Sequence, residues 1–489
     1  MATSESTSPL DFSTFSNVID GKVSATRETT KRAINPSTLE TSPEAPLSTQ
    51  QDVNLAAEIA RNAVPLWAAV PWAKRASTIQ RFADAIEANA EELAKLITMQ
   101  QGKPPMWAEN EIALSVQWLR EFCNMPSPGA VIEDTKDRRV VTRYTPLGVV
   151  VGIVPWNFSI QLACAKIAPA LLTGNVFIWR PSPYTPYCSL KIAELGSKIF
   201  PPGVLQALSG DDNLGPWLTQ HPDINMVSFT GSVGVGKQIM ESCSKTLKRV
   251  TLELGGNDAA IVCADVDPAS VASKIGLIAF ANAGQICIAA KRVYVHESVY
   301  DEVLAALVAY AQGLKLGLEA DSFLGPLSNE LQYERVKSLL ADIEKTGLVV
   351  ATGSTQPLTH MKGYFLAPTI IDNPPDNSRI VVEEQFGPIL PIMKWADEHD
   401  VIRRANSTEL GLGASVWTRD STQADRIASQ LQAGNIWVNC HAVMQPSTPF
   451  AGHKQSGLGV EMGDDGLKAY CNVQSIYVTG THADDIKNE

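Results

Sequence analysis

The chain has 489 residues, of which 45% are hydrophobic and 19% charged, and its formal net charge is −12. This length exceeds the size at which a single hydrophobic core keeps growing, so we expect two or three domains and not a small binding module. The acidic balance, with no basic run to offset it, argues against a nucleic-acid or anionic-membrane partner, and the longest clean apolar stretch, residues 148–155, is too short to span a bilayer.

The N-terminal residues 1–17 are rich in serine and threonine, contain no lysine or arginine and lack an apolar core. They are interpreted as a flexible tail and not as a targeting peptide. Residues 51–94 carry apolar side chains at helical spacing in two stretches, which predicts two packed helices separated near Val70-Pro71. Residues 138–152 alternate and then become continuously apolar, as expected for an exposed ribbon that leads into a buried strand.

Strands and helices then alternate, which is typical of parallel α/β units. The first series predicts helix 163–172, strand 175–179, helix 187–200, strand 204–209 and strand 226–230. The second series predicts helix 268–281, strand 291–295 and helix 298–314. Residues 473–478 alternate again and could pair with the ribbon at 138 as a small third sheet. The pattern therefore predicts an α/β protein with two α/β domains and a small β ribbon.

Charged pairs and cysteines give weaker signals. Two short basic pairs, Lys248-Arg249 and Lys291-Arg292, are interpreted as solvated ends of helices or strands. The eight cysteines are scattered without a CxxC pair or a His/Cys cluster of metal-binding spacing, which predicts a reducing compartment and no metal site. The last three residues, Lys-Asn-Glu, form no peroxisomal address, so we expect a cytoplasmic protein.

A glycine-rich turn at residues 229–237, Phe-Thr-Gly-Ser-Val-Gly-Val-Gly-Lys, lies between a short apolar strand and a helical stretch. Backbone N–H groups at such a helix start, together with the Ser232 hydroxyl, can hold a pyrophosphate. The same residues could also form only a tight turn.

Two further turns hold reactive side chains. Glu253 ends a strand just before Gly255-Gly256, where partial desolvation would raise the pKa of its carboxyl toward that of a general base. The alternative is a surface glutamate in a turn. Cys287 lies 34 residues later in a turn with Gly284, and glycine there allows a close approach of substrate. The alternative is an inert core thiol.

Two last motifs place polar groups where a ligand could bind, although each could also be only a turn. Asn157 follows Pro155-Trp156 at the end of a buried strand, where α/β proteins usually build their sites, and its amide could donate to an oxyanion. Glu384 and Phe386 place a carboxylate and an aromatic ring in one turn, which suits a ribose diol and a ring face.

Together and in this order, these five motifs resemble those of the aldehyde dehydrogenase superfamily over essentially the whole chain. Further matching stretches are residues 35–38, 102–104, 166–171, 201–204 and 449–457. The resemblance implies a Rossmann-like cofactor-binding domain (1–127 and 147–253), an α/β catalytic domain (254–456) and an oligomerisation arm (128–146 and 457–489). It also implies a homodimer or homotetramer in which the ribbons extend sheets across subunits.

The resemblance further implies the NAD(P)-dependent oxidation of an aldehyde to a carboxylic acid. Cys287 would be the nucleophile that carries a thiohemiacetal and then a thioester. Asn157 and the Cys287 backbone N–H would form the oxyanion hole, and Glu253 would activate the hydrolytic water. The implied cofactor-binding residues are Val154, Pro155, Trp156, Arg180, Ser182, Gly231, Ser232, Leu254, Glu384 and Phe386.

One departure from the family pattern concerns the nucleotide. Family members usually hold the adenosine ribose with a lysine and, three residues later, a glutamate, whereas this chain has Arg180 and Pro183. Proline cannot bind the diol. The loss of the carboxylate removes the repulsion that excludes a ribose 2′-phosphate, and arginine is a good phosphate partner. NAD is therefore the expected cofactor, with NADP as an open alternative.

A second departure concerns the substrate. Ala165 and Ala281 occupy positions where bulky aromatic residues often narrow the substrate tunnel of the family. We therefore hypothesise an aldehyde bulkier than acetaldehyde. The alternative is that neighbouring side chains refill the space. The remaining apolar walls of the predicted pocket are Phe158, Leu162, Met444 and Phe450.

Two other functions compete with this interpretation. A CoA-acylating relative would transfer the thioester to a thiol, but such relatives often lack the base that Glu253 would supply. A catalytically idle scaffold of the same fold is disfavoured by the complete set of Asn157, Glu253, Cys287 and Glu384.

Overall fold

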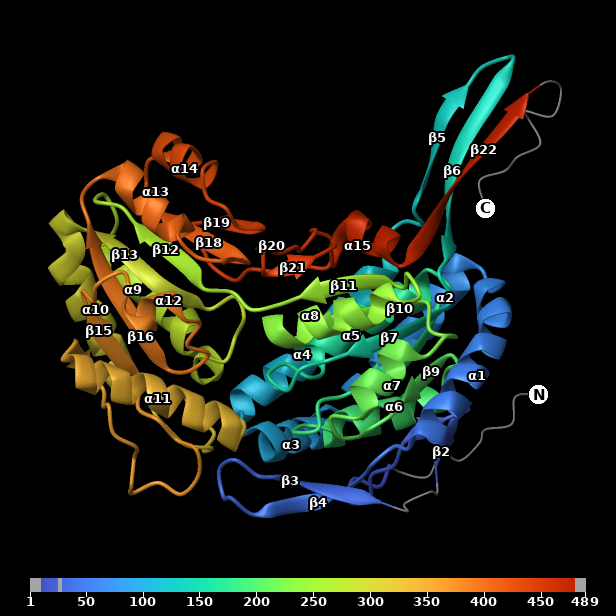
Figure 1. Cartoon of the computed structure of the whole chain (residues 1–489), viewed down its shortest axis with the longest axis horizontal. Helices are drawn as coiled ribbons and strands as arrows, with labels where there is room; N and C mark the ends of the chain where they lie inside the picture. The colour runs from blue at the N-terminus through green and yellow to red at the C-terminus, as the bar shows by residue number, and fades with distance from the viewer. Residues whose placement is uncertain (1–9, 25–28, 480–489) are drawn as a thin grey trace.

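The computed structural model describes residues 10–24 and 29–479. The chain forms two α/β bodies side by side, and a long β ribbon projects from one of them (Figure 1). The last three residues and most of the predicted tail, residues 1–9, lie outside the described part. For residues 10–17, the prediction of a flexible tail is wrong, because several of their side chains pack against the first body. The Phe15 ring lies 4.8 Å from that of Tyr187, and Asn17 Oδ1 accepts the Ser209 N–H at 2.8 Å.

The first body is built on an eight-stranded sheet with the order β2-β1-β9-β8-β7-β10-β11-β21. Its five central strands are parallel, and they include the predicted strand 226–230 with unchanged bounds. The central strands are β7 (Val149–Ile153), β8 (Val176–Arg180), β9 (Leu205–Ala207), β10 (Met226–Thr230) and β11 (Arg249–Glu253). The edges are β1 (Val18–Ile19), β2 (Lys22–Val23) and β21 (Gly457–Leu458).

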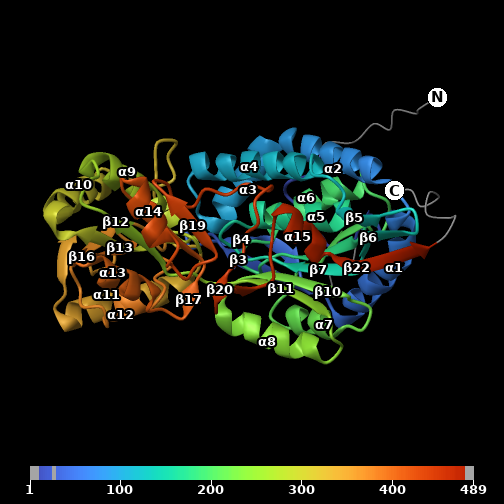
Figure 2. The ribbon, with the colours of Figure 1, turned by 90° about the horizontal axis from the view of Figure 1, so that it is seen from above.

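Eight helices accompany this sheet. The break predicted near Val70-Pro71 is confirmed, but the region predicted as two helices also contains the start of a third, because Asn89 ends the second apolar stretch early. The helices are α1 (Gln50–Ala68), α2 (Trp72–Glu87), α3 (Ala90–Gln101), α4 (Pro105–Cys123), α5 (Gln161–Leu172), α6 (Tyr187–Ser197), α7 (Leu214–Gln220) and α8 (Val233–Ser244). Figure 2 shows α2 and α4 on one side of the sheet and α7 and α8 on the other.

The second body holds a seven-stranded sheet with the order β14-β15-β16-β13-β12-β18-β19, in which only the β14–β15 pair is antiparallel. Its strands are β12 (Asp258–Val262), β13 (Ala290–His296), β14 (Val349–Thr352), β15 (Thr369–Asp372), β16 (Ile389–Trp395), β18 (Gly413–Trp417) and β19 (Asn435–Val438). Its helices are α9 (Pro268–Phe280), α10 (Tyr300–Gln312), α11 (Glu330–Thr346), α12 (Arg379–Val382), α13 (Glu398–Asn406) and α14 (Ser421–Ala428). The two predicted α/β series are thus confirmed as separate sheets.

The ribbon is a three-stranded antiparallel sheet with the order β22-β6-β5. The predicted pairing is confirmed, because β22 (Cys471–Thr479) runs along β6 (Arg138–Pro146), with Val473 opposite Tyr144 and Val478 opposite Arg139. The other edge is β5 (Gly129–Asp134). Residues 457–458, which we had predicted to lie in the arm, pair instead with β11 of the large sheet. None of the helices in the described residues is long and apolar enough to cross a membrane.

The interpretation of the basic pairs as solvated ends is wrong for three of the four residues. Lys248 is 9% exposed, and Lys291 and Arg292 are each 3% exposed. Backbone carbonyls replace water around them. Arg292, for example, donates to the carbonyls of Asn257 and Ala405 at 2.9 and 2.8 Å. Charges buried in this way must be paired or hydrogen-bonded.

Candidate active site

Most of the predicted cofactor residues lie at the C-terminal ends of the parallel strands of the first sheet. The neighbouring strands β8, β7, β10 and β11 are parallel, so their C-terminal ends meet at the same edge. This is where open α/β sheets usually bind ligands. The segments that leave these ends are residues 154–157, 180–182, 231–232 and 253–256.

The chain crosses from the first body to the second through the paired glycines after Glu253. A Cβ atom on Gly255 would lie 2.5 Å from Glu384 Oε2, and one on Gly256 would lie 2.6 Å from the Cys287 carbonyl oxygen. Both distances are shorter than real Cβ atoms show. The two glycines are therefore needed because they let the Cys287 turn and the Glu384 carboxylate lie directly against the crossing segment.

Cys287 lies in a turn between a short 3₁₀ segment (Ala281–Gly284) and β13. Three consecutive residues of that segment, Asn282, Ala283 and Gly284, have φ values of 50°, 54° and 72°. The conformation is unfavourable for the two non-glycine residues, and such backbone is often held at functional sites by its surroundings. The Asn282 side chain accepts from Gln101 Nε2 at 3.1 Å and so helps to hold it.

Asn157 is buried and faces the Cys287 turn. Its Nδ2 donates to the Gln285 carbonyl at 3.0 Å, two residues before the thiol. Its backbone carbonyl accepts from the buried Lys103 at 2.9 Å. The Lys103 ammonium is paired with Glu111 at 2.5 Å and lies 3.7 Å from the centre of the Phe158 ring. Since an amide has two N–H donors, one donor of Asn157 remains for another acceptor.

Glu253 is 4% exposed, and within the described part of the chain neither of its carboxylate oxygens has a hydrogen-bond partner of normal geometry. Burial, and next the negative charge of Glu461, raise the pKa of the Glu253 carboxyl to about 8. Lys166 opposes this shift, as do weaker interactions with the Cys287 thiol and Thr230. The predicted base is therefore buried, faces the predicted nucleophile and titrates close to neutral pH.

The Cys287 side chain is half-buried. Burial, and next the charge of Glu253, raise the pKa of its thiol well above the usual range, while Lys291 acts in the opposite direction. A protonated thiol is a weak nucleophile, so this cysteine depends on a neighbouring base. Glu253 is in place to be that base.

A buried polar network behind Glu253 escaped the sequence analysis. Lys166 on α5 forms an ion pair with Glu461, and the Ser228 hydroxyl lies 3.4 Å from Glu461 Oε1. The Tyr470 hydroxyl donates to the Ser228 hydroxyl at 3.3 Å. The pairing spans 295 positions of the chain, so no local pattern could have indicated it.

The residues expected at the nicotinamide, Glu384 and Phe386, lie in one segment. The Phe386 ring lies 5.5 Å from the ring of Trp156, which is expected on the adenosine and pyrophosphate path, and the two rings are perpendicular. Glu384 Oε1 accepts from Lys291 at 2.5 Å and from the Gly256 N–H at 3.2 Å. In the part of the chain that the structure describes, no hydrogen bond involves Glu384 Oε2. The carboxylate is therefore fixed through one oxygen and has the other available.

The residues expected at the adenosine and pyrophosphate lie at the ends of β7, β8 and β10. The Val154 N–H donates to the Arg180 carbonyl at 3.2 Å, and the buried Ser182 follows β8. The Gly231 N–H donates to the Glu253 carbonyl at 3.0 Å. Ser232 is exposed and is the N-cap of α8, so the predicted helix start at the glycine-rich turn is confirmed. Leu254 is buried against α8, where it contacts Gly236.

The predicted pocket residues are only partly brought together. Leu162, Ala165, Met444 and Phe450 belong to the same apolar cluster as Cys287. Ala281 is buried at the end of α9, and Phe158 has Lys103 over one face of its ring. Both alanines are at most 3% exposed, so atoms of the protein already cover their methyl groups.

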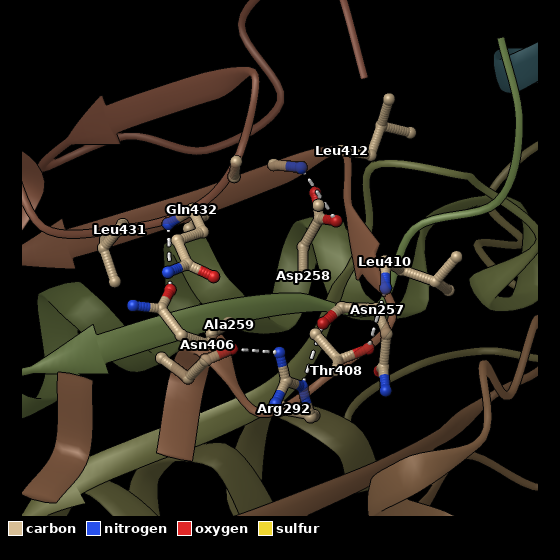
Figure 3. Close-up of a pocket in the computed structure, with 15 residues that line it drawn as sticks. Asn257, Asp258, Ala259, Arg292, Asn406, Thr408, Leu410, Leu412, Leu431 and Gln432 are labelled. Carbon is tan, nitrogen blue, oxygen red and sulfur yellow. Dashed lines mark hydrogen bonds between the residues drawn. The ribbon is translucent and has the colours of Figure 1, made fainter. Parts of the chain in front are cut away.

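Figure 3 shows a separate cavity beneath the crossing segment, lined by residues that include Asn257, Arg292 and Thr408. Its volume is about 10 Å³, which is room for a single water molecule. There the Asn406 amide binds backbone groups, and Arg292 donates to backbone carbonyls and to the Tyr294 hydroxyl. This cavity is too small to hold an aldehyde, and its polar side chains bind other groups of the protein.

The family model described as "Aldehyde dehydrogenase family" matches residues 23–476. The chain is 39% identical to the aldehyde dehydrogenase LUC3 of Fusarium sp., covering 96% of this chain and all of that protein. It is 35% identical to phenylacetaldehyde dehydrogenase of Pseudomonas fluorescens, covering 93% and 94% of the two chains. The NAD⁺ complex of an aldehyde dehydrogenase from Bacillus cereus superposes with a TM-score of 0.92 at 35% identity, covering 95% and 96%. This chain therefore belongs to the aldehyde dehydrogenase family and is an NAD(P)-dependent aldehyde dehydrogenase.

Proposed function

We propose that the protein oxidises an aldehyde bulkier than acetaldehyde to its carboxylic acid through a thioester on Cys287. One observation carries the proposal: the buried Glu253 carboxyl has both oxygens unpaired among the described residues and interacts with the Cys287 thiol. A base with no hydrogen-bond partner of normal geometry among the described residues, beside a thiol that is protonated at neutral pH, is available to groups that enter the site.

In the first step the Cys287 sulfur adds to the aldehyde carbon, and the thiol proton passes to Glu253. The carbonyl oxygen becomes an oxyanion, which accepts the remaining Asn157 amide N–H and the Cys287 backbone N–H. Each such donor contributes about 3 kcal/mol in comparable sites. Gln285, which accepts the other Asn157 N–H at 3.0 Å, keeps the amide oriented.

The bound nicotinamide supplies the hydride acceptor. The chain fits this group, because Lys291 and the Gly256 N–H bind only Oε1 of Glu384, which leaves Oε2 to accept from a ribose hydroxyl, and the perpendicular Trp156 and Phe386 rings offer an aromatic face. At the other end of the nucleotide, Arg180 Nε is buried without a partner among the described residues. An unsatisfied buried guanidinium N–H suits an oxygen of the adenosine ribose.

In the last step water hydrolyses the thioester. After the proton taken from the thiol has passed to solvent, Glu253 takes a proton from the water, the water oxygen adds to the acyl carbon, and the C–S bond breaks. The proton then returns to the sulfur, and the acid leaves. Burial of Glu253 raises the pKa of its carboxyl to about 8, so the carboxylate is a stronger base than an exposed glutamate.

NAD is the cofactor that we propose, with NADP as the alternative. The absence of a glutamate at Pro183 removes one negative charge, but Asp211 and Asp212 act electrostatically on Arg180. These two carboxylates raise the pKa of the Arg180 guanidinium, but burial lowers it by a larger amount. Two carboxylates beside one arginine would repel a 2′-phosphate.

Replacing Asp212 with asparagine should therefore raise kcat/KM for NADP relative to NAD by about tenfold, which corresponds to about 1.4 kcal/mol. Initial rates with both nucleotides measure this ratio. Asp212 is the suitable site because Asp211 also accepts the Asn213 N–H at 3.0 Å. Asp223→Asn, which removes a carboxylate paired with Arg61, is the matched control and should leave the ratio unchanged. A ratio unaffected by Asp212→Asn would show that Asp212 does not select the nucleotide.

The proposed substrate class rests on the small side chains Ala165 and Ala281 and on the flexible Met444, which, like Cys287, packs against the apolar core of the first body. The similarity to a phenylacetaldehyde dehydrogenase supports the same class. Both alanines are buried, which favours the alternative that neighbouring side chains fill the space left by the missing aromatic rings. One variant separates an open substrate pocket from a filled one.

With short, long and aromatic aldehydes, we expect kcat/KM to be higher for bulky substrates than for acetaldehyde. Ala165→Trp should lower kcat/KM for bulky aldehydes by about tenfold or more and spare acetaldehyde, because the indole would fill the pocket. Reduced-nicotinamide absorbance gives both values. If acetaldehyde outpaces every bulky aldehyde, the substrate class is wrong. If Ala165→Trp lowers Tm without changing the substrate ranking, the space is already filled.

We also propose a homodimer or homotetramer joined through the ribbon. Strands β5 and β22 are the two edges of the ribbon within the described residues, and they carry the exposed apolar residues Val131, Ile132, Val473 and Tyr477. Long apolar edges favour pairing with another chain.

We keep the domain division predicted from the sequence as a proposal, and the two large sheets and the ribbon support it. A cytoplasmic location is proposed because all eight cysteines are free thiols, which suits a reducing compartment.

A further inference from the structure

A single buried ammonium connects the nucleophile turn to the residues expected at the nicotinamide. Lys291 is at the start of β13, four residues after Cys287, and its side chain is 3% exposed. Its Nζ donates to the Cys287 carbonyl at 2.8 Å, to the Gly256 carbonyl at 2.7 Å and to Glu384 Oε1 at 2.5 Å. These three bonds use all three N–H donors of the ammonium.

The three acceptors belong to three different segments. Gly256 lies in the crossing between the two sheets, Cys287 in the nucleophile turn and Glu384 in the segment after α12. The ammonium also lies 5.4 Å from the centre of the Phe386 ring. A shift of any of these segments would leave a charge buried without its full set of acceptors, which is strongly unfavourable. Lys291 thus fixes the segments relative to one another.

The same contacts determine which oxygen of Glu384 is available. Oε1 is occupied by Lys291 and by the Gly256 N–H, and Oε2 lies over Gly255. If Lys291 were neutral, the carboxylate could rotate, and both oxygens would compete for the Gly256 N–H. The ammonium therefore presents one defined oxygen at the place where the proposed function expects the ribose.

We propose that Lys291 is a positioning residue that holds the Cys287 thiol and the ribose-binding oxygen of Glu384 in one fixed arrangement and supplies a positive charge close to the thiol. The inference rests on the proposed function for the role of Glu384. It does not depend on turnover for the effect on the thiol, because the contacts exist in the protein without nucleotide. An arrangement fixed before binding costs less ordering when the nucleotide enters.

The charge of Lys291 acts on the thiol against several negative neighbours. Burial and Glu253 raise the pKa of the Cys287 thiol, Lys291 lowers it and Glu384 raises it. Removal of the ammonium should therefore move thiol ionisation to higher pH, and removal of the Glu384 charge should move it to lower pH. Other charged or titratable groups that interact with Glu253 or Lys291 are Lys166, Glu461, Asp258 and His441.

The test uses Lys291→Met and Glu384→Gln in the full-length protein. Iodoacetamide alkylation of Cys287, followed by peptide mass spectrometry without nucleotide, gives the pH profile of the thiol. We expect the Lys291→Met profile to move by about one pH unit to higher pH and the Glu384→Gln profile to move to lower pH. Titration with NAD, followed by tryptophan fluorescence, should show about tenfold weaker binding for Lys291→Met.

Lys248→Met is the matched control. Lys248 is another buried lysine, and its ammonium donates to the Ile224 carbonyl at 3.0 Å and to the His221 carbonyl. It should change Tm but neither the alkylation profile nor NAD binding. If Lys291→Met gives the same result as this control, Lys291 is only structural and the inference is wrong. If Lys291→Met does not fold, the Glu384→Gln profile decides, and a shift to higher pH or none overturns the inference.

Aldehyde oxidation by the unmodified protein separates this inference from the proposed function. Turnover together with an unchanged alkylation profile in Lys291→Met would refute the positioning role and leave the function intact. Shifted profiles without turnover on any aldehyde would support the arrangement around the thiol and contradict the proposed substrate class.

Discussion

Replacing Cys287 with alanine should lower aldehyde oxidation by about 10⁴-fold or more and leave NAD binding unchanged within about twofold. The loss is large because no thioester can form without the sulfur, and Asn157 and Glu253 then have no covalent intermediate to act on. Binding should survive because the contacts expected for the nucleotide come from other residues, among them the Trp156–Phe386 pair and Arg180. Steady-state rates and tryptophan fluorescence provide the two measurements.

Cys440→Ala is the matched control for this variant. Cys440 is also a half-buried cysteine of the apolar cluster that contains Cys287, so it tests whether any thiol in this region matters. It should retain turnover within about twofold, since exchanges of small apolar side chains are usually tolerated. Survival of turnover in Cys287→Ala, or its loss in Cys440→Ala, would assign the nucleophile to another group.

Regular elements were predictable from the sequence because their signals are local. The strand at Met226–Thr230 was placed with its observed bounds, and the pairing of β22 with β6 followed from alternation in both segments. The order of Asn157, Glu253, Cys287 and Glu384 along the chain indicated the site before any geometry was known. The paired glycines after Glu253 were visible as a motif, but their contact with Glu384, 128 positions away, was not.

Contacts between residues that are far apart along the chain could not be predicted from the sequence. Lys291 and Arg292 looked like an ordinary surface pair, yet they are buried because carbonyls from Gly256 and Ala405 converge on them. The ion pair of Lys166 with Glu461 joins residues 295 positions apart. A buried lysine is expected only where such acceptors exist, and short-range patterns do not report acceptors from distant segments.

Glu253→Gln should separate the two halves of the reaction. Glutamine keeps the size of the side chain but cannot take a proton from water, so hydrolysis of the thioester should slow by about 10²- to 10⁴-fold. At high pH, where the Cys287 thiol can lose its proton to solvent without Glu253, a burst of about one reduced nucleotide per site should then precede a slow steady state, as is typical of an accumulating acyl-enzyme. Rapid-mixing absorbance measures both phases. A small thiol added as acyl acceptor should restore turnover, because it can attack the thioester without this base.

The pH profile supplies an independent check. The proposed base is the carboxylate form of Glu253, and burial raises the pKa of this group to about 8. Hydrolysis in the unmodified protein should therefore increase about tenfold per pH unit below that value and level off above it, while Glu253→Gln should lose this dependence. Glu461→Gln removes a negative charge that raises the pKa of Glu253, so its profile should move to lower pH. A profile unchanged in Glu253→Gln would exclude Glu253 as the base, and absence of the burst at high pH would show that thioester formation, and not its hydrolysis, limits this variant.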